Sequence, residues 1–194
     1  ASSNANTNVS MLGESFKYVA PLAGTLGYTA EDTSIALGLM ANAGIKGSQA
    51  GTSLKTALAR MSAPTAKQAA AMKKLGISLT DSEGNMKSLR DVMGDLRTSF
   101  AGMSESEQAA AASTIFGKEA MSGMLAIINA SESDFDKLTA AIDGSAGAAE
   151  RMAAVRLDNL EGDITLLKSA LEGLGIEIYQ GMNAPMREAA QAAS

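Results

Sequence analysis

Apolar residues recur every three or four positions along most of the chain, which is the spacing that places them on one face of an α-helix. Ile35, Leu39 and Ala43, for example, form an apolar stripe on one predicted helix. Glycine and proline interrupt this pattern repeatedly, as they do at helix ends. The sequence therefore predicts an all-α protein, with a small body of several helices over residues 10–143.

Polar residues mark where several of these helices begin. Thr29 precedes two acidic residues, whose negative charges favour the positive end of a helix. Pro64 ends one helix, because the residue before a proline is disfavoured in helical geometry, and Thr65 begins the next. Ser104 and Glu107 have the spacing of a capping box. These signals predict helix starts at three separate places.

Residues 77–87 depart from the helical pattern. Apolar and polar residues alternate there around a turn at residues 81–85, which predicts one short β-hairpin-like element on the helical body. The Asp-Ser-Glu-Gly-Asn run from Asp81 to Asn85 also resembles part of a calcium-binding loop. It lacks the later bidentate Glu that such a loop requires, so a turn is the preferred interpretation.

The most regular pattern lies in the segment 148–181. Seven apolar residues follow one another there at alternating spacings of three and four, which is the heptad seam of helices that wrap around one another. The seam consists of Leu157, Leu160, Ile164, Leu167, Leu171, Leu174 and Ile178. The sequence therefore predicts a long helix with a coiled-coil seam after the body.

Charged residues flank this seam in pairs of opposite sign. With Leu157 at the first heptad position, Arg156 faces Glu161 and Asp163 faces Lys168 in a parallel self-associating coiled coil. The seam then mediates formation of a small homo-oligomer, such as a trimer. The alternative is one amphipathic helix that packs on its own domain, and the sequence leaves both interpretations open.

The predicted organisation has five parts. A polar lead-in, 1–9, precedes the body, and a Gly/Ser/Ala junction at 144–147 separates the body from the heptad helix at 148–181. Residues 182–194 are expected to form a short C-terminal helix that leads into the rest of a longer chain.

Composition removes several classes of chemistry. The chain has no Cys and no His, which excludes thiol nucleophiles, zinc sites built on these ligands and His-dependent catalytic triads. Only 4% of the residues are aromatic, whereas twelve are Met. Most of these methionines fall on apolar helical faces, so they are expected to fill the core. The sequence predicts no cofactor and no metal site.

No motif indicates an enzyme. The glycines between Gly44 and Gly51 lack the spacing and the Lys-Ser/Thr of a phosphate-binding loop, and they are interpreted as breaks between helices. Acidic pairs such as Asp134 with Asp136 stand two residues apart and point away from each other on a helix, so they are unsuited to joint acid–base catalysis. We expect the chain to be non-enzymatic.

Charge is distributed unevenly along the chain. Residues 1–102 have a net charge of +3, whereas residues 103–194 have a net charge of −8. Because binding to a phosphate backbone depends on clustered cations, the acidic second part argues against specific nucleic-acid binding.

Four segments in order resemble phage tail tape measure proteins. The stretch Gly38–Thr65, GLMANAGIKGSQAGTSLKTALARMSAPT, closely resembles the core of that family, and the similarity continues through Leu75–Asn85. Ile115-Phe-Gly-Lys118 and Leu167–Ile178, LKSALEGLGIEI, are also similar to it. The resemblance covers nearly the whole chain and lies in the ordered combination of these segments.

The resemblance implies a structural role in a virion. Members of this family lie in the lumen of the tail tube in a few copies, set the tail length during assembly in the host cytoplasm, and leave ahead of the genome on infection. The implied partners are tail tube and tail tip proteins and tail assembly chaperones, with contact to the host membrane on ejection.

A second functional class is also considered. The Ala- and Gly-rich segment 109–128 suggests a membrane- or envelope-interacting helical module that assists genome delivery. Binding of the purified chain to liposomes would favour this alternative over a purely structural segment.

Overall fold

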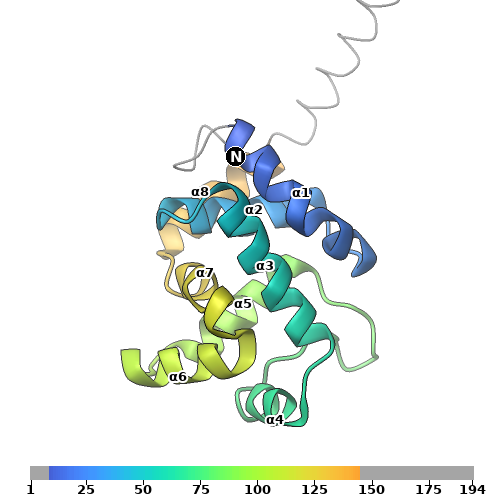
Figure 1. Ribbon diagram of the computed structural model, residues 1–194, viewed down its shortest axis with the longest axis vertical. Helices are drawn as coiled ribbons and strands as arrows, with labels where there is room; N and C mark the ends of the chain where they lie inside the picture. Colours follow the sequence, from blue (N-terminus) through green and yellow to red (C-terminus); the bar gives the residue numbers. More distant parts are fainter. Residues whose placement is uncertain (1–8, 145–194) are drawn as a thin grey trace, which may run out of the picture. The chain divides into compact units, whose positions relative to one another are not determined.

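The computed structural model describes residues 9–144, which belong to one unit of the chain, residues 1–145. Within this described part the chain forms eight α-helices and no β-strand, so the prediction of an all-α body is confirmed (Figure 1). The helices are α1 (Val9–Thr25), α2 (Ala30–Asn42), α3 (Gly47–Ser62), α4 (Ala66–Lys74), α5 (Leu89–Phe100), α6 (Glu105–Phe116), α7 (Lys118–Ile128) and α8 (Glu132–Asp143).

Helix α2 forms the centre of the body. Helices α1, α3, α5, α7 and α8 all pack against it (Figure 1). Every residue from 35 to 41 is buried, whereas Ala43, beyond the helix end, is exposed. The predicted stripe through Ile35, Leu39 and Ala43 therefore describes α2 incompletely, because a central helix is apolar on all sides rather than on one.

Two glycines allow helices to cross closely. Gly51 of α3 lies against the backbone of Ser15 in α1, and a side chain at Gly51 would overlap the Ser15 carbonyl oxygen. A Cβ atom at Gly123 of α7 would lie 2.8 Å from Cβ of Ser53 in α3. The interpretation of Gly51 as a break between helices is thus wrong: it lies inside α3 at a crossing point. Gly44 does follow a helix end, with φ +87°.

The predicted helix starts are confirmed. The Thr29 side chain accepts a hydrogen bond from the Asp32 backbone N–H at the start of α2, and Thr65 accepts one from Gln68 at the start of α4. Ser104 and Glu107 form a complete capping box at the start of α6. Each cap satisfies backbone donors that the first helical turn leaves without partners.

Methionine side chains fill the core as predicted, together with two phenylalanines. Met40 is fully buried, and four further methionines are buried almost completely: Met61, Met72, Met93 and Met124. Met121 is partly buried against the same core. The Phe100 and Phe116 rings stack with their centroids 6.3 Å apart, which joins the ends of α5 and α6.

The β-hairpin-like element at residues 77–87 is not confirmed. In the described part of the chain, this segment forms one isolated antiparallel bridge, between Thr80 and Met86, and no strand. The alternation instead reflects an extended loop whose apolar side chains Ile77 and Leu79 are buried in the body. The loop connects α4 to α5.

Candidate binding groove

A groove of about 640 Å³ lies between the 77–87 loop and the ends of α1, α3 and α4. Its lining is largely apolar, and Lys73 is the one charged residue in it. The lining residues are Leu26, Met61, Ser62, Pro64, Ala69, Met72, Lys73, Gly76, Ile77, Ser78, Leu79, Thr80 and Met86. The groove therefore combines residues that are up to 60 positions apart in the sequence.

The Asp81 carboxylate shapes the loop that borders the groove. It accepts hydrogen bonds from the backbone N–H groups of Glu83, at 2.8 Å, and Asn85, at 2.9 Å. These bonds, led by the one from Asn85, lower the pKa of Asp81 because they stabilise its charged form. Gly84, with φ +88°, supplies the left-handed turn conformation. Asp81 thus acts as a turn residue in this structure.

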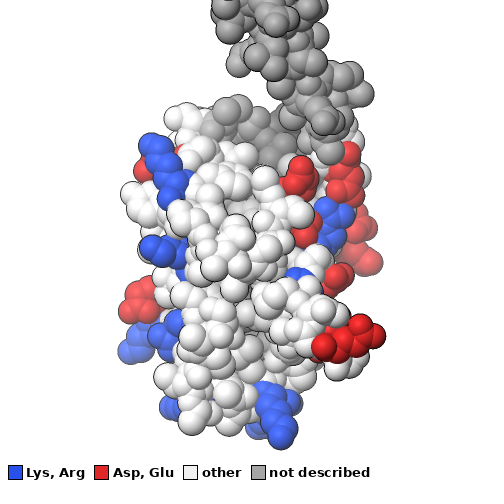
Figure 2. Space-filling model, turned by 90° about the vertical axis from the view of Figure 1, so that its right-hand side faces the viewer, with Lys and Arg blue, Asp and Glu red and all other residues white. Residues whose placement is uncertain are grey.

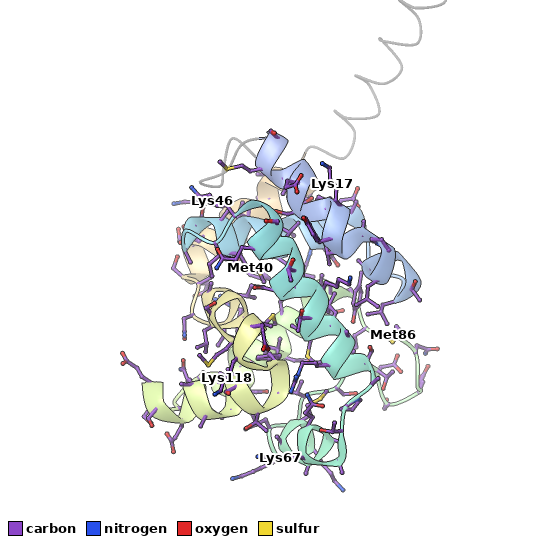
Figure 3. The ribbon with its side chains drawn as sticks, in the orientation of Figure 1. Lys17, Met40, Lys46, Lys67, Met86 and Lys118 are labelled. Atoms are coloured by element: carbon purple, nitrogen blue, oxygen red, sulfur yellow. The ribbon has the colours of Figure 1, made fainter. Side chains whose placement is uncertain are left out.

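The groove suits binding rather than catalysis. Its lining residues Met61, Met72, Ile77 and Leu79 are at most 7% exposed. Met86 lies on the loop (Figure 3), and it is 43% exposed. The lining offers one titratable side chain, so it contains no acid–base pair. In the described part of the chain, no group of three or more acidic residues is placed to hold a metal ion.

The charged residues lie mostly away from the centre of the face that carries α1 and the 77–87 loop. Figure 2 shows this face as a broad uncharged area, with basic and acidic side chains along its margins. Tyr18 of α1, which is 40% exposed, adds an aromatic side chain to the exposed apolar residues of the body. An uncharged face with an apolar groove is suited to contact with another apolar surface.

A second polar feature fixes the end of α6. The Ile115 carbonyl oxygen accepts hydrogen bonds from Nε2 of Gln68 at 3.2 Å and from Nε of Arg60 at 3.4 Å. Gln68 is 4% exposed, and its Oε1 accepts a bond from the Thr65 backbone N–H. This buried amide joins the start of α4 to the end of α6, so it holds one wall of the groove in place.

An arginine links three helices on another part of the body. Nε of Arg90 in α5 donates to Asp32 of α2 at 3.1 Å, and both Nη atoms donate to Asp143 of α8, at 2.9 and 3.0 Å. The pairing with Arg90 lowers the pKa of Asp143. Asp32 is 6% exposed, so this cluster supplies a partner for a buried carboxylate.

Neither the groove nor this arginine cluster was predicted from the sequence. The cluster has a signal in the sequence: Arg90 stands in the first turn of its helix and Asp143 in the last turn of another. Each charge is unfavourable for the dipole of its own helix, which indicates a partner elsewhere in the fold. The groove has no comparable signal, because it exists only once distant segments pack together.

The predicted heptad seam lies outside the described residues, and so do its flanking charge pairs. These residues are Leu157, Leu160, Ile164, Leu167, Leu171, Leu174 and Ile178, with Arg156, Glu161, Asp163 and Lys168.

The segment proposed for membrane contact, 109–128, is described and forms most of α6 and α7. Its larger apolar side chains, including Ile115, Phe116 and Ile127, are fully buried in the body. None of the described helices has the length and apolar character needed to cross a bilayer.

Comparison with known proteins identifies the family. Residues 1–117 match the phage-related minor tail protein family. The chain belongs to this family. It is 41% identical over 180 residues to the tape measure protein of Pneumococcus phage Dp-1, an alignment that covers 93% of this chain and 16% of that protein. It is 33% identical over 186 residues to the probable tape measure protein of Escherichia phage P2, covering 94% of this chain and 23% of that protein.

The resemblance to tape measure proteins is therefore confirmed, and the chain is similar to part of a phage tail protein. It spans less than a quarter of the length of either relative. No solved structure matches the chain.

Proposed function

We propose that the chain is a structural, non-enzymatic segment of a tape measure protein that lies in the lumen of the tail tube and helps to set tail length. The observation that carries this proposal is the similarity of more than nine-tenths of the chain to two tape measure proteins. The segment assembles in the host cytoplasm with tail tube and tail tip proteins and tail assembly chaperones. It leaves the tail ahead of the genome on infection.

The proposed division of labour follows the domain prediction. The body, 10–143, is a packed unit that makes specific contacts. The junction 144–147 connects it to the ruler segment, 148–181. Residues 182–194 then lead into the rest of a longer chain. Helix length is proportional to residue number, at ~1.5 Å per residue, so a continuous helix can set a distance. The short helices of the body, which turn back on one another in Figure 1, are unsuited to that task.

The length of the assembled tail tests whether residues 148–181 act as a ruler. In the phage that encodes this chain, tandem duplication of residues 148–181 adds 34 residues, which correspond to ~50 Å of helix. Electron microscopy should show tails longer by about this amount, and deletion of the same residues should shorten them similarly. An inserted flexible Gly/Ser segment of equal length is the control, because a coil of that size spans only ~30 Å. Tails of unchanged length in all three phages would contradict the proposal.

The heptad seam is proposed to hold a small number of copies together along the tube axis. Light scattering of the purified chain should give the mass of a small homo-oligomer, such as a trimer. The double substitution Leu160→Asp with Leu167→Asp should reduce it to a monomer, because it places charges in an apolar interface. Thr165→Asp with Ser169→Asp adds the same charge off the seam and should leave the mass unchanged. A monomeric wild-type chain would show that the stripe serves another purpose.

The groove is proposed as the place where the body contacts another tail component. Ala69 is exposed on α4 and lines the groove, whereas Ala70 is exposed on the same helix outside it. Ala69→Arg should fill the groove without disturbing the core and should reduce the yield of complete tails. Ala70→Arg makes the same chemical change one position away and should assemble normally. Equal yields of complete tails from the two phages would show that the groove is not a contact site for another tail component.

A further inference from the structure

Helix α8 is attached to the body through α2 and buries few apolar side chains of its own. It packs on α2, and two of its apolar side chains, Leu138 and Ile142, are buried, with Phe135 partly buried beside them. In contrast, α2 itself is buried along most of its length. Apolar burial therefore contributes less to holding α8 than to holding the central helices.

An arginine of α5 fastens the C-terminal end of α8. Arg90 forms a bidentate pair with Asp143, the last residue of α8, while its Nε donates to Asp32. The Arg90 side chain is 30% exposed and that of Asp143 is 53% exposed. Such a pair is specific in geometry, yet dissolved ions can weaken it.

A second arginine of α5 fastens the N-terminal end. Nη1 of Arg97 donates to the carbonyl oxygen of Ala130, at 2.6 Å, in the turn that leads into α8, and to that of Ile127, at 3.3 Å, in the last turn of α7. Its guanidinium also lies over the Phe135 ring of α8, 5.1 Å from the ring centroid. Arg90 and Arg97 are two helical turns apart, so they lie on one side of α5 and reach the two ends of α8.

Helix α8 has features that oppose its attachment. Oγ1 of Thr139 is buried and has no hydrogen-bond partner in the described structure, although water would satisfy it if α8 separated. Asp143 stands at the negative end of the α8 dipole, with no basic residue in the last turn to offset it. At 12 residues, α8 is also too short to be a stable helix by itself. Its order therefore depends on contacts with the body, which are the apolar packing on α2 and the two arginines.

We propose that α8 is a releasable latch, fastened at its two ends by Arg90 and Arg97, which detaches from α2 while the rest of the body stays folded. Release exposes the face of α2 that α8 covers. Residues 145–194 follow α8 directly in the sequence, so a force applied through them reaches α8 before the other described helices. The latch is a property of the fold and does not depend on the proposed function, so tail length and latch release are tested independently.

A single cysteine measures release. The chain contains no Cys, so Thr139→Cys introduces its sole thiol on α8 with little change in size, at a partly buried residue whose hydroxyl oxygen is buried. The rate at which a thiol reagent labels the full 194-residue chain then reports how often α8 opens. Ser53→Cys places the reference thiol at a 3% exposed position where α3 crosses α7.

Salt and charge substitutions should accelerate labelling at one position only. Raising NaCl from about 0.05 M to about 1 M should increase the rate for Thr139→Cys by about two- to fivefold, because salt screens partly exposed pairs. Adding Asp143→Asn should give a similar increase at low salt and remove most of the salt effect. Asp95→Asn is the matched control: Asp95 lies on α5, as Arg90 does, and its 2.7 Å ion pair is with Lys87 of the 77–87 loop rather than with α8.

Two results would overturn the latch. One is a labelling rate for Thr139→Cys that neither salt nor Asp143→Asn changes. The other is an equal increase at Ser53→Cys, which would show that the body opens as a whole. Hydrogen exchange of the α8 amides in the Cys-free chain, compared between low and high salt, decides the question if either thiol variant fails to fold. Uniform exchange across α2, α3 and α8 would then count against release of α8 alone.

Discussion

Gly51 in α3 and Ser15 in α1 bring the backbones of two helices into direct contact. The hydroxyl of Ser15, which is 3% exposed, donates to the Gly47 carbonyl oxygen at 2.7 Å, one turn before Gly51 in α3. A Cβ atom at Gly51 would overlap the Ser15 carbonyl oxygen. The crossing is therefore closed to any larger residue, and the hydrogen bond fixes the relative position of the two helices.

Gly51→Ala should destabilise the body because the two helices must separate to admit one methyl group. Overpacking of this kind typically costs about 1–3 kcal/mol, which corresponds to a Tm several degrees lower. Thermal unfolding followed by circular dichroism measures the effect. Gly94→Ala is the control: nothing lies within 4 Å of a Cβ atom there, and alanine should stabilise α5 by up to about 1 kcal/mol. Equal effects of the two substitutions would refute the close crossing.

Tyr28 predicts a specific sensitivity to alkaline pH. Its hydroxyl is buried without a hydrogen-bond partner in the described structure, and burial raises the pKa of Tyr28 to about 12. This folded-state pKa lies above the ordinary value of about 10, so the folded state favours the neutral phenol. Tyr28 therefore lowers the stability only at a pH high enough for the unfolded chain to ionise it. The stability of the chain should thus be lost between pH ~10 and pH ~12 in part through this residue.

Tyr28→Phe should raise the urea midpoint at neutral pH, since it removes a buried hydroxyl whose lack of a partner costs about 1–3 kcal/mol. It should also reduce the loss of stability between pH ~10 and ~12. Tyr18→Phe changes a side chain that is 40% exposed and should do neither. The relevant quantity is the difference between variant and wild type, because the lysines titrate equally in both. An unchanged alkaline loss in Tyr28→Phe would argue against this origin.

Local signals made the helix ends predictable. Thr29 and Ser104 cap their helices through hydrogen bonds to residues three positions ahead, so the interaction is visible within four residues of sequence. The central position of α2 was not predictable in this way. A helix buried on all sides and one with an apolar stripe differ in their neighbours, which come from five other parts of the chain.

The loop at 77–87 shows why alternation misled. Ile77 and Leu79 are buried in the body and Ser78 between them is only partly buried, which reproduces the period of a strand without a partner strand. The groove beside this loop is lined by Leu26 and Met86, which are 60 positions apart in the sequence. No local sequence pattern could have predicted that they lie together. The seam at 148–181 rests on periodicity and remains a prediction.

Acid should weaken the latch through Asp143. Arg90 holds the pKa of Asp143 below its ordinary value, so the ionised carboxylate is favoured in the folded state. The contribution of the Asp143–Arg90 pair to the attachment of α8 is therefore complete above the unfolded pKa of about 3.9. It is lost as the pH falls through the lower folded pKa of Asp143. With no His in the chain, little should change between pH ~5 and ~8.

Hydrogen exchange of the α8 amides, corrected for the pH dependence of intrinsic exchange, measures this loss. Exchange in the wild type should accelerate below pH ~4, whereas Asp143→Asn should already exchange faster at neutral pH and show a smaller further change. Asp136→Asn removes a carboxylate that is exposed on the same helix and should follow the wild type. Parallel acid profiles for all three chains would show that Asp143 is not the group responsible.

Thr139→Val should act in the opposite direction to the charge substitutions. Valine keeps the branched shape of threonine but replaces the buried hydroxyl, which has no partner in the described structure, with a methyl group. Attachment of α8 should then be stronger by about 1–2 kcal/mol, and its amides should exchange roughly tenfold more slowly. Thr98→Val, at an exposed position of α5, is the control and should leave α8 unaffected.

Combining Thr139→Val with Asp143→Asn should restore exchange toward the wild-type rate, because one change strengthens and the other weakens the same contact. Faster exchange in Thr139→Val alone would mean that the hydroxyl does have a partner in solution and that α8 is held more firmly than its contacts indicate.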